Sequence, residues 1–500
     1  MNIKVGMSHL FLLFALFQFG LTSAQSIKDH PEIYAAYHDV LKLKLESGRA
    51  KLNQVIPNQA QLGHYHYVKS LADVIEILIT EDPALYKKYE DSEEDNLDGL
   101  REMDENDPHR RFYNAEIKIQ WAIIKIMFDE DMKAGLSLKT AYNYTERNIE
   151  KHPDFEANYK SYGSLHVLFA VVPESYHWIL RLFGIKGNSI LGWDELNRIQ
   201  PDNPYWLETG LIKSLIAINI LNKEQQTLEL LDELREDHKD NLVVNYLYNT
   251  ALIKYAKSEQ ALPNLRKLLF ASEDYHQIVN VYYKLGDVYM QKQQYPLARY
   301  HLSKFLNQHK GKNYVKDTWF KIFLSYWLEG NEKMAEIHWN KAKESGDTFA
   351  SADRNAKSIL DEDHYPNSLL MKARLATDGG YFELADKALN DIQQGSLADK
   401  KEESEYFYRY GRLYDKMERD QDAIFNYLNA IKKAGKENWY FAPSACLYTG
   451  YIYEFRKDYK KAEFYYEKAM SYKKHSYKAG IDNKAHAALE LLEDKLPTED

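Results

Sequence analysis

The 500-residue chain has a single cysteine, Cys446, so no disulfide can form within it and the disulfide-rich class of small secreted folds is excluded. Proline and glycine are scarce, with 13 and 22 residues, which excludes collagen-like and linker-like compositions. With 45% hydrophobic and 28% charged residues, the composition is that of a folded protein. Cys446 falls within a helical pattern, and we expect it to be a buried packing residue rather than a nucleophile.

Blocks of basic residues are absent too, and the formal net charge is −10. We therefore expect no nucleic acid as a partner, because phosphate backbones are bound by clustered positive charge. An anionic membrane surface is disfavoured for the same reason. Peripheral membrane contact through the apolar stretch 161–183 is an alternative to its role as a buried joint.

Motifs for catalysis and metal binding are missing as well. The sequence has no His-Glu-x-x-His, no paired-cysteine metal site, no nucleophile elbow and no glycine-rich phosphate loop. We expect a protein that is not an enzyme and that needs no cofactor and no metal. A remote alternative is a helical toroid that acts on a glycan, with Asp287 as a candidate acid.

Residues 1–24 differ from the rest of the chain. Lys4 precedes an apolar run over 10–21, and the small residues Thr-Ser-Ala at 22–24 suit a cleavage site. We predict an export signal. A retained membrane anchor is the alternative, but the run is shorter than the roughly 20 residues of a membrane-spanning helix. No cysteine follows the run, which argues against a lipid anchor, and we expect a bacterial periplasm or cell envelope.

One pattern recurs through the second half of the chain: a large residue, Leu-Gly or an equivalent, an aromatic residue, and then an alanine. It is clearest at Tyr282, Leu285, Gly286, Tyr289 and Ala298. Four further alanines follow in phase, namely Ala335, Ala385, Ala423 and Ala462. Small residues at fixed positions let paired helices approach to about 8–10 Å. The expected fold class is all-α, an α-α superhelix of the tetratricopeptide repeat type.

The organisation that we predict has five segments. They are a signal peptide at 1–24, an N-terminal helical region at 25–135, an apolar helical joint at 136–200, repeats at 201–480, and a capping helix with a tail at 481–500. Within the repeats, 205–235 and 242–270 read as two degenerate helix pairs. The acidic run 361–364 falls in the longest interval between repeat alanines and is expected to be a solvated connector.

The first helix of each pair is expected to line a concave groove that binds a protein or peptide partner. The candidate site residues are Tyr283, Asp287, Met290, Phe320, Leu324, Trp327, Arg374, Tyr408, Arg412 and Tyr451. Apolar side chains would bury against the partner, and the two arginines would bind its carboxylates. The alternative is that these residues pack against neighbouring repeats or against the N-terminal helices of the same chain.

A more specific resemblance covers residues 112–200. Its signature includes Ala115-Glu116-Ile117, Trp121-Ala122, Phe128-Asp129-Glu130-Asp131, Gly163, and 183–188. This segment resembles the tetratricopeptide-repeat protein 39 family, which includes the fungal inclusion-body clearance protein. The resemblance implies an adaptor without known catalysis, implicated in clearing aggregated protein and in lipid handling inside eukaryotic cells. The export signal departs from that family, so we expect the architecture to carry over but not the cellular role.

Taken together, these features predict an exported adaptor or scaffold that binds a protein or peptide partner in its groove. The second reading is a structural subunit of a cell-envelope complex, assembled through the outer surface of the repeats.

Overall fold

A computed structural model describes residues 25–170, 187–221, 224–362, 364–393, 395–493 and 495. The described residues form helices and connecting turns, with no strand among them. The chain is thus all-α, as the sequence predicts. The predicted signal peptide at 1–24 lies outside the described residues, and so does part of the predicted joint, at 171–186.

The N-terminal half is a stack of helices in which proline and aspartate mark several starts. Pro83 and Pro108 stand at the first helical position, and the side chains of Asp82 and Asp107 accept hydrogen bonds from the backbone of the first turn. The elements are η1 (Ile27–Asp29), α2 (Pro31–Leu41), α3 (Leu45–Leu52), α4 (Leu62–Thr80), α5 (Pro83–Lys88), α6 (Ser92–Gly99), η2 (Leu100–Glu102), α7 (Pro108–Met127), α8 (Asp131–Lys151), α9 (Asn158–Ala170) and α11 (Ser189–Leu196).

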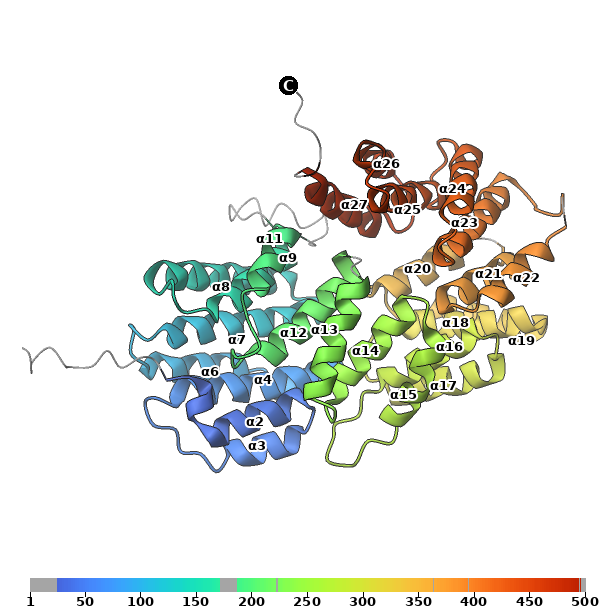
Figure 1. Ribbon diagram of the computed structural model, residues 1–500. Helices are drawn as coiled ribbons and strands as arrows, with labels where there is room; N and C mark the ends of the chain where they lie inside the picture. Colours follow the sequence, from blue (N-terminus) through green and yellow to red (C-terminus); the bar gives the residue numbers. More distant parts are fainter. Residues whose placement is uncertain are drawn as a thin grey trace, which may run out of the picture.

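The remaining helices form a solenoid of antiparallel pairs (Figure 1). The elements are α12 (Trp206–Ile216), η4 (Ala217–Leu221), α13 (Glu224–Asp237), α14 (Leu242–Lys254), α15 (Ser258–Leu268), α16 (Asn280–Gln291), α17 (Tyr295–Gln308), α18 (Val315–Glu329), α19 (Glu332–Glu344), α20 (Ser351–Leu360), α21 (Ser368–Gly379), α22 (Phe382–Asn390), α23 (Lys400–Lys416), α24 (Asp420–Ala434), α25 (Phe441–Phe455), α26 (Tyr459–Ser471) and α27 (Lys478–Glu493). The longest interval between repeat alanines holds an additional helix, α20, which the sequence pattern did not predict.

Within each pair, the helices cross at a small residue. The alanines that the repeat pattern predicts, Ala298, Ala335, Ala385, Ala423 and Ala462, are fully buried. On the facing helix, a methyl group added to Gly411 would lie 2.4 Å from the ring of Tyr427, and one added to Gly450 would lie 2.4 Å from the ring of Tyr466. The helix backbones therefore approach as closely as the tyrosine rings between them allow.

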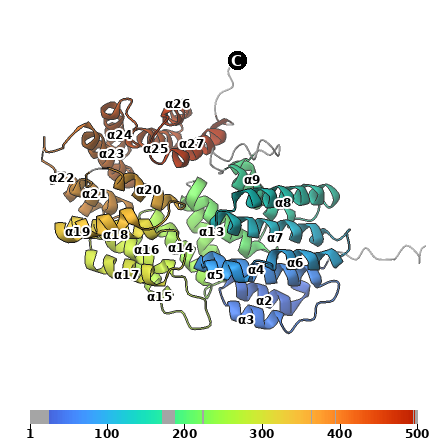
Figure 2. The same ribbon diagram turned by 180° about the vertical axis from the view of Figure 1, so that it is seen from behind.

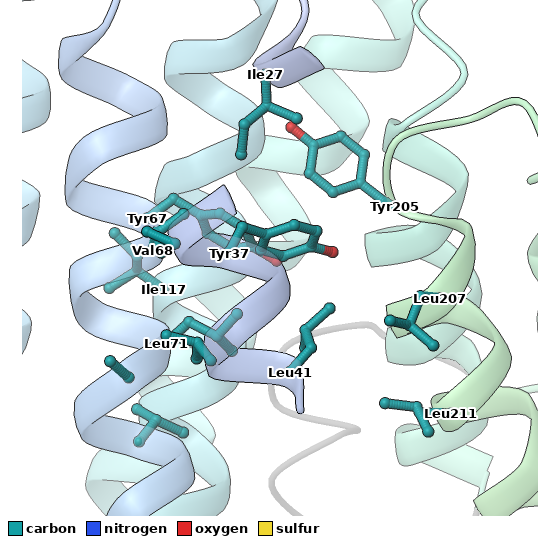
Figure 3. Close-up of a cluster of buried hydrophobic side chains, with 14 of the residues drawn as sticks. Ile27, Tyr37, Leu41, Tyr67, Val68, Leu71, Ile117, Tyr205, Leu207 and Leu211 are labelled. Carbon is teal, nitrogen blue, oxygen red and sulfur yellow. The ribbon is translucent and has the colours of Figure 1, made fainter. Parts of the chain in front are cut away.

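A single hydrophobic core links the N-terminal helices to the first repeats. Tyr205, Leu207 and Leu211 at the start of α12 pack with Tyr37 and Tyr67 from the N-terminal helices (Figure 3). The same cluster continues to Tyr255. Packing is thus continuous across residue 200, where the sequence suggested a boundary.

A buried charge network fixes the same junction. Lys160 on α9 is fully buried and forms ion pairs with Glu116 on α7, at 2.5 Å, and with Glu208 on α12, at 2.9 Å. The hydroxyl groups of Tyr37 and Tyr67 donate hydrogen bonds to Glu208. Every charge in this network has a partner, which is the condition under which buried charges are tolerated.

The solenoid curves until its last helix meets the middle of the chain. Helix α27 contacts α25 and α26 on one side and η4 and α11 on the other, and both views show it above the green helices (Figures 1 and 2). A second closure joins the α21–α22 turn to the α14–α15 turn. There Gly380, at φ +83°, lies so close to the carbonyl oxygen of Ala256 that an added methyl group would be 1.9 Å from it.

The crossing glycines give a matched test of this packing. We expect Gly450→Ala to lower the free energy of unfolding by about 1–3 kcal/mol, because the Tyr466 ring must move. The control is Gly480→Ala in α27, where nothing lies within 4 Å of the added methyl group. There the loss of backbone freedom in the unfolded chain should stabilise the protein by about 0.5–1 kcal/mol. Urea unfolding followed by circular dichroism measures both, and equal effects of the two variants would contradict the tight crossing.

Candidate functional site

The C-terminal solenoid forms the walls of an open cavity of about 840 Å3. Its walls come from α14, α21, α23, α25 and α27, together with the turns that follow α14 and precede α27. Four predicted site residues line it, namely Arg374, Tyr408, Arg412 and Tyr451. A cavity of this size falls within the range of about 300–1,000 Å3 that is typical of ligand sites.

Positive charge predominates on the cavity wall. Seven basic residues line it, namely Lys254, Lys257, Arg374, Arg409, Arg412, Lys416 and Lys484. The acidic residues are Glu224, Asp378, Asp415 and Glu418. The wall has a formal excess of three positive charges, in a chain whose net charge is −10.

On one side of the cavity an arginine lies against a tyrosine ring. The guanidinium group of Arg412 lies 4.1 Å from the ring centroid of Tyr448, which in turn stacks on Tyr427 at 6.0 Å. Arg412 also lies 3.6 Å from Asp415. Burial raises the pKa of Asp415, and Arg412 opposes that rise. This wall offers aromatic faces and guanidinium groups that are held in place by their neighbours.

Arg374 joins α21 to the last helix. Its Nη2 donates to the hydroxyl of Tyr477, at 3.2 Å, and its Nε lies 3.9 Å from Asp378. Asp378 is also 4.0 Å from Arg412, so a single carboxylate is shared by two guanidinium groups. Among the described residues, the one ion pair of Arg374 is this shared contact with Asp378, whereas Arg412 also pairs with Asp415.

Two lysines reach the cavity from helices that are far apart in the sequence. Lys254 is the last residue of α14. Its side chain lines the cavity and is exposed there to solvent. Lys484 lies in α27 and is half-buried. The Lys484 ammonium group, followed by burial, lowers the pKa of Lys254 to about 8. Burial, with Arg412 adding to it, lowers the pKa of Lys484.

The other end of the predicted groove is packed core. Tyr283, Met290, Phe320 and Leu324 are at most 5% exposed, so they present no open surface to a partner. Trp327 is partly buried, and its Nε1 donates to the carbonyl oxygen of Pro366, at 2.9 Å. The expectation of an open aromatic groove at this end needs correction, because neighbouring helices cover it.

Asp287 is likewise occupied within the protein. It forms an ion pair with Lys321, which also lies 2.6 Å from Asp317. The hydroxyl of Tyr283 accepts a hydrogen bond from Lys321 and donates one to Asp317. Burial raises the pKa of Asp287, and the ammonium group of Lys321 opposes that rise. These contacts tie α16 to α18.

Comparison with known proteins agrees with the helical pairs described above. Residues 445–475 match the tetratricopeptide repeat family. No curated protein matches the chain. These residues include most of α25 and α26, so the match falls on one wall of the cavity.

Several solved structures of helical proteins are similar at low identity. The human IFIT1 dimer with PPP-AAAA is 14% identical, with a TM-score of 0.32, over 88% of this chain and 99% of that chain. The APC/C hetero-tetramer Cut9–Hcn1 is 12% identical, with a TM-score of 0.29, over 90% and 95%. Yeast Tom70 is 10% identical, with a TM-score of 0.26, over 93% and 90%. None of these similarities bears on what this chain binds.

The sequence did not predict the roles of Lys254, Asp378, Tyr448 and Lys484. Lys254 falls in a helix pair that diverges from the tetratricopeptide repeat pattern, and Lys484 falls in the capping helix. Their meeting depends on the curvature of the whole solenoid, for which no local signal exists in the sequence.

The described residues offer neither a metal-binding cluster nor a membrane-spanning helix. Within them, no three His, Cys, Asp or Glu side chains are grouped so as to hold a metal ion. No helix in the described part of the chain combines the length and the hydropathy that crossing a membrane requires.

Proposed function

We propose that this chain is an exported scaffold, without catalytic activity, that holds a segment of a partner protein in its C-terminal cavity. The observation that supports it is the 840 Å3 cavity walled by Arg374, Tyr408, Arg412 and Tyr451. Aromatic and arginine side chains around a desolvated pocket are the groups that contribute most to protein recognition. The tetratricopeptide match at 445–475 agrees with a binding scaffold.

The proposal also includes a family with which this chain would share its architecture. The signature at 112–200 resembles the tetratricopeptide-repeat protein 39 family, and we propose that this chain shares its architecture. Ala115 and Glu116 of that signature contribute to the buried core and to the ion pair with Lys160. The signature thus includes residues on which the N-terminal stack depends.

A second function is favoured by a different surface. Phe425 on α24 and Phe464 on α26 are 65% and 54% exposed on the outer helices of consecutive repeats. Exposed aromatic residues in neighbouring repeats suit assembly with another subunit of an envelope complex. The two functions use different faces of the solenoid, so one set of variants distinguishes them.

Peptide binding is tested with the mature protein, residues 25–500, and a phage-displayed library of random dodecapeptides. We expect the library to yield binding peptides. Their affinity should fall at least tenfold in the double variant Arg412→Ala, Tyr451→Ala, because the cavity wall loses one guanidinium group and one aromatic ring. The control, Phe425→Ala with Phe464→Ala, should bind within twofold of the native protein. Thermal unfolding confirms that both variants fold.

The opposite pattern would contradict the cavity as the binding site. Binding that persists in the cavity variant but is lost in the outer-face variant would support the envelope-subunit function instead. A library that yields no binding peptide would refute the scaffold proposal in this form.

The export part of the proposal has its own measurement. When the full chain is produced in a bacterium with an outer membrane, we expect it in the periplasm with Gln25 as its first residue. N-terminal sequencing of the fractionated protein measures this. Recovery from the cytoplasm with Met1 retained would contradict it.

A further inference from the structure

Lys254 and Lys484 face the same cavity without a carboxylate partner. In the part of the chain that the structure describes, neither ammonium group forms an ion pair. The nearby carboxylates are already engaged: Glu224 pairs with Lys257 at 2.8 Å, and Asp415 lies beside Arg412. The two lysines are thus cations that line one cavity and have no ion-pair partner among the described residues.

This arrangement costs free energy in the absence of a ligand. The positive charge of Lys484 is the largest influence that lowers the pKa of Lys254 to about 8, and Arg412 lowers it further. Tyr448 and Asp378 act in the opposite direction but do not restore the usual value. An anion placed among these cations would be attracted to each of them, and this attraction would offset their mutual repulsion.

We propose that the cavity binds a carboxylate of an acidic peptide segment, held between the ammonium groups of Lys254 and Lys484 and the guanidinium group of Arg412. This inference rests on the proposed function and names the chemistry that its partner presents. Charge-assisted hydrogen bonds to a carboxylate are among the strongest available to a protein.

The surrounding charges favour a carboxylate over a polyphosphate. Four acidic residues line the same wall, and they would repel the successive phosphates of a nucleic acid. The excess of three positive charges suits one or two carboxylates instead. Tyr448 and Tyr451 supply ring faces for the apolar side chains that flank an acidic residue in a peptide.

Calorimetric titration of the mature protein at pH 7 tests the inference with the peptides that the library selects. We expect these peptides to contain Asp or Glu, and replacement by Asn or Gln should weaken binding at least tenfold. Lys254→Met with Lys484→Met should weaken binding of the acidic peptide at least tenfold and leave the neutral version unchanged. Lys257→Met is the matched control, because Lys257 lines the same cavity but is paired with Glu224.

The double lysine variant should fold normally. It removes a repulsion, so its thermal unfolding midpoint should equal or exceed that of the native protein. A lower midpoint would show that the two charges stabilise the fold, and that result would overturn the inference.

The pH dependence gives a signature that a structural lysine would not produce. Because the pKa of Lys254 is about 8, its positive charge is present at pH 7 and is lost as the pH rises to 9. Affinity for the acidic peptide should therefore fall over this interval. Lys254→Arg keeps its charge and should lose less affinity than the native protein between pH 7 and pH 9, since Lys484, whose pKa burial also lowers, is then the remaining lysine of the site that titrates.

Two further results would overturn the inference, and a third outcome separates its failure from failure of the proposed function. Selected peptides that bind with no dependence on their acidic residues would leave the scaffold intact and refute the carboxylate site. Glutarate that binds as tightly as the acidic peptide would identify a free small acid as the ligand. If no peptide is selected and glutarate does not bind, both proposals fail.

Discussion

The close crossing of paired helices at glycine and alanine is the constraint on which this structure depends. At Gly411 and Gly450 the side chain is absent, and the ring of a tyrosine from the facing helix fills the space. The hydroxyl of each tyrosine then donates to a carboxylate, Tyr427 to Asp415 at 2.9 Å and Tyr466 to Glu454 at 2.7 Å. Repetition of this unit sets the rotation from one pair to the next. The accumulated curvature brings α27 back to η4 and α11 and encloses the cavity.

A comparison of Lys160 with the two cavity lysines shows which charges stabilise the fold and which do not. Lys160 is fully buried between Glu116 and Glu208, and its two ion pairs explain why its charge is tolerated within the fold. Lys254 and Lys484 both line the cavity, and the charge of Lys484 lowers the pKa of Lys254. Neither lysine forms an ion pair among the described residues. A fold gains nothing from like charges held together. We therefore propose that a ligand, and not stability, accounts for their placement.

Sequence reasoning succeeded where the signal was local. Ala423 and Ala462 are buried, as predicted, because helical spacing and residue size determine where two helices of one pair can cross. It failed where the answer depends on how pairs stack: Met290 and Phe320 have the spacing of groove residues but are covered by neighbouring helices. The placement of α14 and α27 around one cavity could not be predicted from the sequence either. It depends on the rotation between successive pairs, which is a small angle that no single residue encodes.

The central claim is that α27 returns far enough for Lys484 to share one cavity with Lys254 of α14, and chemical cross-linking tests it most directly. Disuccinimidyl glutarate, applied to the monomer at pH 8, should join Lys254 to Lys484, as measured by mass spectrometry of the tryptic peptides. Lys118 and Lys125, which both contact Glu93, provide the positive control. A cross-link between Lys118 and Lys125 without one between Lys254 and Lys484 would contradict the closed solenoid.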